Sequence, residues 1–397
     1  MKFALRQFNM GIKQDAAKFA ALIGGSFIAC IAHNFIYQLL CDLSLVAYRS
    51  VPISLFLSVA RDSHLAIIGF AYSAYLPRAT GRTYNPVTFD NRLILMTDFR
   101  IGIDLGGTKT EVILLNGSSH ELFRTRIPTV RDDYDATLRD IAGLVAQAEV
   151  AAGETQLPVG IGIPGTISRK TGWVKNANST WLNGKPFQKD LSEFLMREVK
   201  VTNDANCLAV SEATDGAGRS YELVFAGILG SGCGAGIAFQ GKPMVGPNGV
   251  AGEWGHNPLP WSSDAELKAR PCYCGKAGCQ ETFLSGTGLC LSYQLATGEK
   301  IKGDEIVVRA QSGEAAAQKI LTDYYDQLAR GFAAIINIMD PDVIVLGGGA
   351  SNIAGIYTEV PKLLPNYVFG RECDTPIVPA VYGDSSGVRG AAWLNPL

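Results

Sequence analysis

The pattern of apolar and polar positions along the chain changes in character near residue 95. Before that point, an uncharged stretch at 19–41 follows several basic residues and leads into further apolar sequence. Its length and flanking charges are typical of a signal-anchor helix, but glycines and polar residues interrupt it, so insertion into a membrane would be marginal. If this region is ordered, we expect helices at about 15–45 and 51–60.

Three interpretations of residues 1–95 remain open. The first, which we favour, is that the segment is no part of the functional protein. Met96 stands three residues before the first strand of the regular pattern, where a natural start is expected. The second is a membrane anchor at 19–41, and the third is an additional subdomain.

From residue 99 onward the pattern is that of alternating strands and helices. Apolar residues alternate at Ile101 and Ile103, and a short apolar run at 111–115 follows a glycine turn, which predicts a β-hairpin. A third strand is expected at 121–127, an amphipathic helix at 134–152 and a buried strand at 159–163. Three antiparallel strands, a helix and a strand are the element order of a ribonuclease-H-like half-domain.

The rest of the chain repeats this theme. Strands at 222–229 and 235–239 flank a second glycine-rich turn, which echoes the first hairpin. We therefore predict an α/β protein with two such domains, 96–215 and 216–397, and a nucleotide held between them. The remaining expected elements are a helix at 187–197, a strand at 199–203, a helix from about 206, a long helix at 315–339, a strand at 343–346, a helix in the 350s and a last helix at 386–394.

Composition narrows the partners and the compartment. The chain has 397 residues, a net charge of -2 and 18% charged residues, which gives no indication of a nucleic-acid partner. Its nine cysteines lack the spacing of a secreted disulfide framework. We expect a reducing compartment, the cytoplasm, and a small neutral or anionic ligand.

The first glycine turn carries groups suited to a phosphate. Gly106 and Gly107 allow close approach of backbone amides to an anion, Thr108 and Lys109 add a hydroxyl and a cation, and Asp104 can hold a hydrated Mg²⁺ ion. A strand follows the lysine, so this is no Walker A loop. An ordinary hairpin turn would have the same sequence, which leaves that alternative open.

Two further glycine-rich loops strengthen the nucleotide interpretation. The second turn offers another set of backbone amides, and the triple glycine after the strand at 343–346 permits close approach to a ribose or a flat ring. A plain turn explains each loop alone, but two phosphate loops in one chain are harder to dismiss. The residues are Gly230, Ser231, Gly232, Cys233 and Gly234, and then Gly347, Gly348 and Gly349.

Asp204 is the candidate catalytic base. It follows the strand at 199–203 and precedes a helix, at the edge of the sheet where α/β proteins bind ligands. An N-cap role is the common alternative at such a position. A kinase that acts on an alcohol needs a carboxylate to accept the hydroxyl proton, and for that reason we predict that Asp204 is the general base.

The segment 252–281 predicts a structural zinc site. His256, Cys272, Cys274 and Cys279 match a tetrahedral Cys₃His set, and the intervening glycines permit the tight turn. Four protein ligands close the coordination shell, so the metal would be structural; reduced cysteines on a loop are the alternative. The metal would fix the flanking carboxylates relative to a sugar, because polyhydroxy substrates are recognised by several amides and carboxylates at once. The candidates are Asn178, Asn203, Asp204, Glu253, His256 and Glu281.

These motifs together resemble a known family. The first turn resembles the phosphate loop of the actin, hexokinase and Hsp70 superfamily, and residues 99–395 resemble the ROK family of repressors and sugar kinases. The resemblance implies an actin-like fold with a nucleotide and sugar cleft, ATP and Mg²⁺ as cofactors, structural Zn²⁺ and a homodimer. It assigns the base to Asp204, sugar contacts to the candidates above, and metal and sugar contacts together to His256.

Three stretches, 176–184, 252–261 and 383–390, are similar to the fructokinases of this family, which also accept mannose. This implies phosphorylation of the 6-hydroxyl of D-fructose, also of mannose and weakly of glucose. A glucokinase or another sugar kinase of the family is the alternative. A sugar-responsive regulator and a membrane-tethered sugar sensor also remain open, although residues 1–95 lack the basic recognition helix of the family's repressors.

Overall fold

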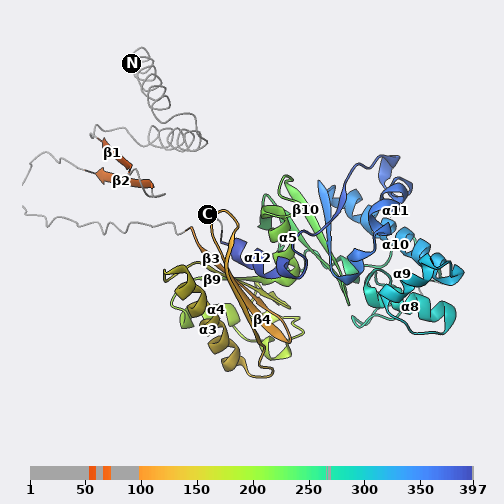
Figure 1. Cartoon of the computed structure of the whole chain (residues 1–397), viewed down its shortest axis with the longest axis horizontal. Coiled ribbons are helices and arrows are strands. Elements are labelled where there is room, and N and C mark those ends of the chain that lie inside the picture. Colours follow the sequence, from red (N-terminus) through yellow and green to blue (C-terminus); the bar gives the residue numbers. More distant parts are fainter. Residues whose placement is uncertain (1–52, 60–65, 73–97, 265, 267–269, 396–397) are drawn as a thin grey trace, which may run out of the picture. The chain divides into compact units, whose positions relative to one another are not determined.

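The computed structural model describes residues 53–59, 66–72, 98–264, 266 and 270–395 (Figure 1). The chain divides into two compact units, Met1–Arg92 and Leu93–Leu397. Among the helices that the structure describes, none has the length and hydropathy needed to cross a lipid bilayer. The expected helix at 15–45 and the candidate anchor at 19–41 lie outside the described residues.

The first unit contains a β-hairpin in its described part. Strand β1 (Ile53–Val59) pairs antiparallel with β2 (Ala66–Tyr72). The helix expected at 51–60 is therefore wrong. The run between Pro52 and Arg61 is short and contains β-branched and aromatic residues, and a second such run follows it closely, so strand pairing prevails over helix formation.

The second unit contains two five-stranded sheets with the same plan. In each, an antiparallel hairpin pairs along one strand with further strands that run parallel to it. The first sheet has the order β5 (Glu121–Pro128), β4 (Lys109–Leu115), β3 (Arg100–Leu105), β6 (Val159–Ile163) and β9 (Val199–Asn203). The second has the order β12 (Lys242–Pro243), β11 (Cys233–Phe239), β10 (Leu223–Leu229), β13 (Val343–Gly347) and β14 (Ile377–Pro379).

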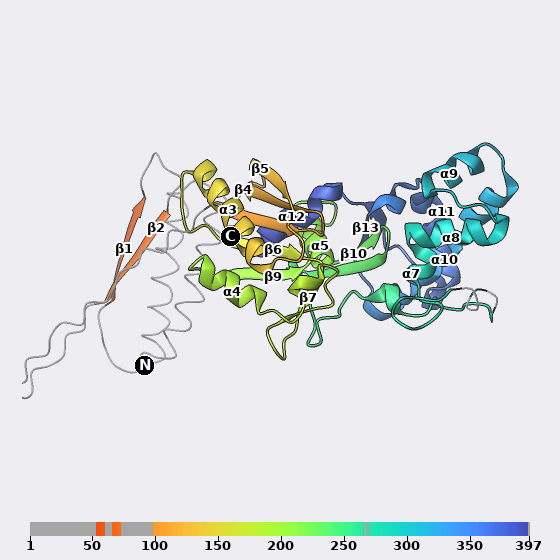
Figure 2. The ribbon, with the colours of Figure 1, turned by 90° about the horizontal axis from the view of Figure 1, so that it is seen from below.

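Helices cover both sheets, and two of them match their predicted bounds. These are α3 (Tyr134–Ala152), which lies beside the first sheet, and α10 (Ala315–Met339), which packs with α8, α9 and α11 (Figure 2). Helix α4 (Phe187–Phe194) ends before the predicted Arg197 because Met196 adopts a positive φ of 53°, which an α-helix cannot contain. Further helices in the described residues are α7 (Glu281–Leu284), α8 (Gly286–Thr297), α9 (Gly303–Gln311) and α11 (Gly355–Leu363).

Short elements complete the unit. They are β7 (Thr166–Ile167), β8 (Val174–Lys175) and the 3₁₀ helices η1 (Thr180–Leu182), η2 (Trp254–His256), η3 (Gly349–Asn352), η4 (Leu364–Asn366), η5 (Phe369–Arg371) and η6 (Gly383–Ser385).

Helices α5 (Asp204–Thr214) and α12 (Ser386–Trp393) connect the two halves of this unit. Helix α12, the last of the chain, packs on β3, β4 and β6 of the first sheet, whereas α5 packs on β10 and β11 of the second. The two helices pack against each other, and the buried Arg389 guanidinium pairs with Asp215 just after α5. Glycine is required at position 160, because a Cβ there would lie 1.9 Å from the Ala391 carbonyl oxygen. The predicted domain boundary between residues 215 and 216 therefore separates the two sheets. It does not assign α5 and α12 to the sheets on which they pack.

Candidate active site

All of the predicted sugar-binding residues line one cleft of about 290 Å³. One side of the cleft comes from the carboxyl ends of the first sheet and from the start of α5. The other side comes from the second glycine-rich turn, the segment 252–256 and the start of α7. The cleft therefore lies between the two halves of the second unit. Its residues include Asn178, Asn203, Asp204, Glu253, His256 and Glu281.

Asp204 is the first residue of α5, but it is not the N-cap. That position belongs to Asn203, whose side chain accepts a hydrogen bond of 2.9 Å from the Ala205 N–H. The Asp204 Oδ1 atom shares the same donor at 2.8 Å. Asp204 is exposed to the cleft, so its other oxygen remains available to a ligand. The Asn203 side chain also makes a hydrogen bond to the Asp204 carboxylate, and this bond acts to lower the pKa of Asp204.

The surroundings of Asp204 strengthen it as a proton acceptor. Desolvation by the walls of the cleft raises its pKa, and the charge of Glu253 raises it further, while the Ala205 N–H acts in the opposite direction. A carboxylate with a raised pKa binds a proton more readily than an ordinary one. This is the property that general-base catalysis requires.

A second carboxylate, Asp104 at the end of β3, carries negative charge that its neighbours do not balance. Burial, Asp204 and Glu111 together raise the pKa of Asp104 to about 7, although Lys109 lowers it. The negative charge of Glu111 is balanced by Arg124 at 2.8 Å. The repulsion that remains is the one between Asp104 and Asp204. A divalent cation bound by oxygen ligands would relieve this repulsion.

The second glycine-rich turn joins this cleft to a larger cavity of about 1070 Å³. Gly230 and Ser231 line both cavities. The start of α8 holds the turn in place, because the Gly286 N–H donates to the Gly230 carbonyl at 2.7 Å and the Thr287 hydroxyl donates to the Ser231 carbonyl at 2.7 Å. The sequence did not single out Thr287, Lys300, Lys302 or Asn352, which also line this cavity and belong to no recognisable motif.

The other two glycine loops contribute less to these cavities than predicted. Gly106, Gly107, Thr108 and Lys109 line neither of them, whereas Asp104 of the same hairpin lies close enough to Asp204 for their charges to interact. Of the third loop, Gly349 lines the larger cavity, Gly347 ends β13, and Gly348 packs against the second turn. A Cβ on Gly348 would lie 2.6 Å from the Leu229 carbonyl carbon.

The predicted metal ligands form one cluster. The ligand atoms of His256, Cys272, Cys274 and Cys279 all lie within 4.8 Å of one another. The Nδ1 atom of His256 is 3.6 Å from the Cys272 sulfur, and the Cys274 and Cys279 sulfurs are 3.5 Å apart. These separations match the edges of a zinc tetrahedron, which are about 3.5 to 3.8 Å for bonds of about 2.0 to 2.3 Å. The donor set and these two separations fit zinc.

Two glycines place the segment that carries Glu253 and His256. Gly252 has a φ of +93°, and a Cβ at this position would lie 2.0 Å from the Ala235 carbonyl oxygen. A Cβ at Gly255 would lie 1.8 Å from the Cys233 carbonyl oxygen. The backbone of this segment therefore lies directly on β11. Between the glycines, the buried Trp254 stacks on Phe332 of α10 at 5.4 Å. Glu253 and His256 are left at the cleft.

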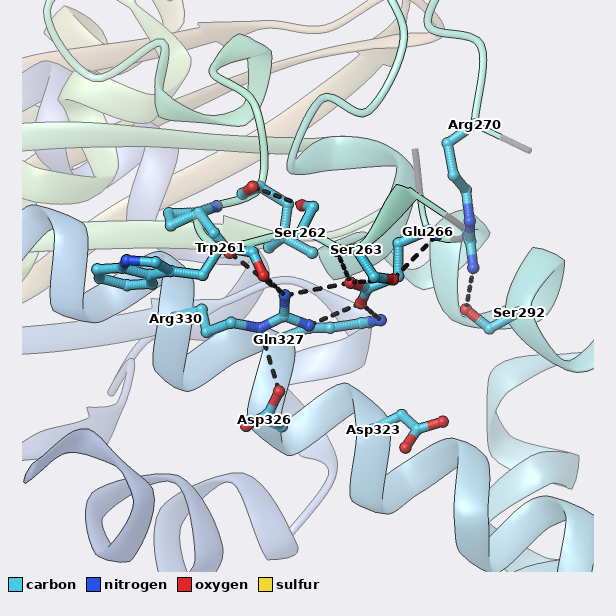
Figure 3. Close-up of polar contacts among 12 residues, drawn as sticks. Trp261, Ser262, Ser263, Glu266, Arg270, Ser292, Asp323, Asp326, Gln327 and Arg330 are labelled. Carbon is cyan, nitrogen blue, oxygen red and sulfur yellow. Dashed lines mark hydrogen bonds and ion pairs between the residues drawn. The ribbon is translucent and has the colours of Figure 1, made fainter. Parts of the chain in front are cut away.

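Ionic and polar contacts fasten the following segment to α10 (Figure 3). Arg330 pairs with Glu266 at 2.7 Å and donates to the carbonyl oxygens of Pro260 and Trp261 at 3.2 Å. Burial acts to raise the pKa of Glu266, but hydrogen bonds from Arg330 and the Ser263 N–H outweigh it and lower the pKa to about 2. The approach to the predicted metal ligands is thereby anchored on a long helix with one buried face.

Tyr273 is a cleft residue that sequence analysis missed. It stands between Cys272 and Cys274, lines the cleft, and has its hydroxyl oxygen 2.9 Å from His256 Nε2. Its position in sequence between two predicted ligands was the only available signal.

Known proteins are similar to this chain in sequence and in fold. The sequence model of the ROK family matches residues 100–396. An N-acetyl-D-glucosamine kinase from Escherichia fergusonii is 39% identical over 298 residues, which are 74% of this chain and 98% of that protein. The crystal structure of a ROK hexokinase from Thermus thermophilus superposes with a TM-score of 0.66 at 28% identity, covering 75% of this chain and 97% of that one. The structure of a ROK family glucokinase from Streptomyces griseus, solved with glucose and AMPPNP, has a TM-score of 0.59 at 26% identity. The match covers 74% of this chain and 98% of that one.

Proposed function

Because this chain belongs to the ROK family, we propose that it is an ATP-dependent sugar kinase that phosphorylates the 6-hydroxyl of a hexose, with D-fructose as its main substrate. The observation that carries the proposal is the position of Asp204, exposed in a cleft whose opposite wall is the second glycine-rich turn. The fold class of the chain is the predicted one, with two ribonuclease-H-like halves of the actin, hexokinase and Hsp70 type.

The arrangement supports in-line transfer of a phosphoryl group. A hexose in the small cleft meets Asp204, which accepts the proton of the attacking hydroxyl as its oxygen bonds to the γ-phosphorus of ATP. The turn at Gly230 and Ser231 lines both cavities and would present backbone amides to the phosphates between them. ADP leaves with the bridging oxygen, and the sugar leaves as its 6-phosphate.

Two metal ions belong to this proposal. Asp104, with its raised pKa and unbalanced neighbours, would hold Mg²⁺, which neutralises phosphate charge when bound. His256, Cys272, Cys274 and Cys279 would hold a structural Zn²⁺ that keeps Glu253 and Glu281 at the cleft. We expect closure of the two halves over the substrates to expel water, which would otherwise accept the phosphoryl group.

The identity of the hexose rests on sequence similarity. The stretches 176–184, 252–261 and 383–390 favour fructose, with mannose and glucose as poorer substrates. The relative at 39% identity is named for N-acetyl-D-glucosamine, which makes that sugar the main competitor. A cleft of about 290 Å³ lies at the lower end of the usual range for ligand pockets and suits a monosaccharide.

A hexose panel is the decisive experiment. Purified protein with Mg²⁺ and ATP would be offered fructose, mannose, glucose and N-acetylglucosamine, with ADP release measured by a coupled assay. The proposal expects the highest kcat/KM with fructose. A higher kcat/KM with N-acetylglucosamine would make that sugar the main substrate in place of fructose. Inactivity toward all four sugars would refute the proposed kinase function.

Two functions of other classes have their own tests. A sugar-responsive regulator requires specific DNA binding in a gel-shift assay, and a membrane-tethered sensor requires the full-length chain in the membrane fraction of cells. We propose instead a homodimeric kinase without a nucleic-acid partner, and size-exclusion chromatography with light scattering would test its oligomeric state.

A further inference from the structure

Tyr273 occupies an unusual place for a large aromatic side chain. It lies on the turn that carries Cys272 and Cys274, and 83% of it is exposed, yet it lines the same cleft as Asp204 and Glu253. Its ring meets the ring of His256 edge to face, with 5.1 Å between the centroids. An exposed aromatic residue that borders a polar cleft adds nothing to a hydrophobic core, so packing does not explain its position.

The contacts of His256 determine what Tyr273 can do. The Nδ1 atom of His256 faces the sulfur of Cys272 within the metal cluster, while Nε2 lies 2.9 Å from the Tyr273 hydroxyl oxygen. Both imidazole nitrogens therefore already have partners. A sugar contact through the His256 ring alone, as expected from the sequence, would have to displace one of them.

The hydroxyl of Tyr273 still has bonding capacity. A phenol can donate one hydrogen bond and accept others. When Nδ1 serves as a metal ligand, the proton of the imidazole is on Nε2, which then donates to the Tyr273 oxygen. The phenol O–H is then left to donate into the cleft, which Tyr273 lines.

We propose that Tyr273 contacts the sugar directly and helps to determine which hexose is accepted, an inference that rests on the proposed kinase function. Its hydroxyl donates a hydrogen bond to an oxygen of the bound sugar, and its ring limits the size of the substituent on that side. The metal cluster then has a specific purpose, because it orients His256, and His256 orients Tyr273.

Two substitutions separate the contributions of the hydroxyl and of the ring. Tyr273→Phe removes the hydrogen bond and keeps the ring, whereas Tyr273→Ala removes both. Tyr221→Phe is the matched control, since Tyr221 lines neither cavity. Each protein would be assayed for its zinc content, its KM for ATP, its kcat and KM for the four hexoses, and its sugar affinity without nucleotide by calorimetry.

Loss of one hydrogen bond should weaken sugar binding by about threefold to tenfold. We expect Tyr273→Phe to raise the KM and Kd of the preferred sugar by that factor, with the zinc content and the KM for ATP unchanged. Tyr273→Ala should additionally alter the ranking of the hexoses in favour of the bulkier N-acetylglucosamine. Tyr221→Phe should match the wild type.

The inference and the proposed function fail in different ways. If the wild type phosphorylates hexoses but Tyr273→Phe keeps its sugar Kd within twofold and Tyr273→Ala keeps the ranking, Tyr273 is no sugar contact. If both variants lose zinc together with activity, Tyr273 supports the metal site only, and the inference is again overturned. A wild type inert toward every hexose overturns the kinase function and this inference with it.

Discussion

The carboxylate of Glu281 accepts a hydrogen bond from the backbone N–H of Cys233, with 2.9 Å between Oε2 and the nitrogen. Glu281 begins α7, two residues after the predicted metal ligand Cys279, and Cys233 belongs to the second glycine-rich turn. This contact connects the metal cluster with the turn that lines both cavities. A change at Glu281 should therefore affect both substrates.

We expect Glu281→Ala to lower kcat/KM by about 10- to 100-fold, the cost of a lost hydrogen bond to a charged group. The KM values for sugar and ATP should rise together. Glu281→Gln retains an oxygen acceptor and should lose less, and Glu193→Gln, on the exposed surface of α4, serves as the control. Steady-state kinetics with both substrates varied would test this. A rise in the sugar KM alone would show that the contact with Cys233 has no influence on nucleotide binding.

Asp204→Asn should remove the general base and leave the cleft otherwise intact. Turnover should fall by about 10²- to 10⁴-fold, the usual contribution of a positioned base, while the sugar Kd measured by calorimetry changes by less than about threefold. Asp323→Asn, at an exposed position of α10, is the control. A variant that retains a near-normal rate would show that another group accepts the proton.

Glu253 should set the pH dependence of catalysis through Asp204. Its negative charge raises the pKa of Asp204, so that Glu253→Gln should lower this pKa. Since the base must be deprotonated to act, the acidic limb of kcat should move to lower pH in the variant. The pH profile would be measured at saturating sugar, because the variant should also bind sugar more weakly. An unchanged limb, or one at higher pH, would contradict this coupling.

Asp104 should destabilise the ligand-free protein at neutral and alkaline pH. Its pKa rises from 3.8 to about 7 on folding, so that the folded state binds a proton that the unfolded state releases. Stability therefore falls as the pH rises from about 4 to 7. Asp104→Asn removes this cost and should be more stable than the wild type at pH 8 by about 2 to 4 kcal/mol, with little difference near pH 4.

Urea unfolding without nucleotide or Mg²⁺ would measure the effect of Asp104→Asn at each pH. Asp98 lies just before β3 in the sequence, and Asp98→Asn is the control for the loss of a single negative charge. A variant that is less stable than the wild type at pH 8 would show that Asp104 makes a favourable interaction as an anion.

Removal of zinc should weaken sugar binding more than nucleotide binding. Zinc bound by His256 and the three cysteines, as proposed, would fix the loop that ends at Glu281 and presents Glu253, whereas the larger cavity is lined by α8 and the third glycine loop. Chelator-treated protein, with metal loss verified by elemental analysis, should show at least a tenfold higher sugar KM and recover on addition of Zn²⁺. Unchanged activity after complete metal loss would refute this role.

Local signals predicted most of the regular structure. The bounds of α3 follow from its apolar face, from Asp133, which caps the first turn, and from Gly153 in the left-handed conformation at the end. Strand β6 follows from a short run without polar side chains, and β9 from the alternation of Val199 and Val201 with polar residues. The end of α4 did not follow, because the positive φ of Met196 depends on the chain around it.

The candidate site was predictable in composition but not in arrangement. The sequence by itself determined which residues are candidates for phosphate, sugar and metal binding, because carboxylates after strands, glycine turns and a Cys₃His set have few other uses in combination. Only the tertiary structure decided that the six predicted sugar residues share one cleft, that the turn at Gly106 lines neither cavity, and that Tyr273 completes the contacts of His256. Residue types and local propensities act over a few positions, whereas the distances between side chains on different strands and loops are set by how the whole chain packs.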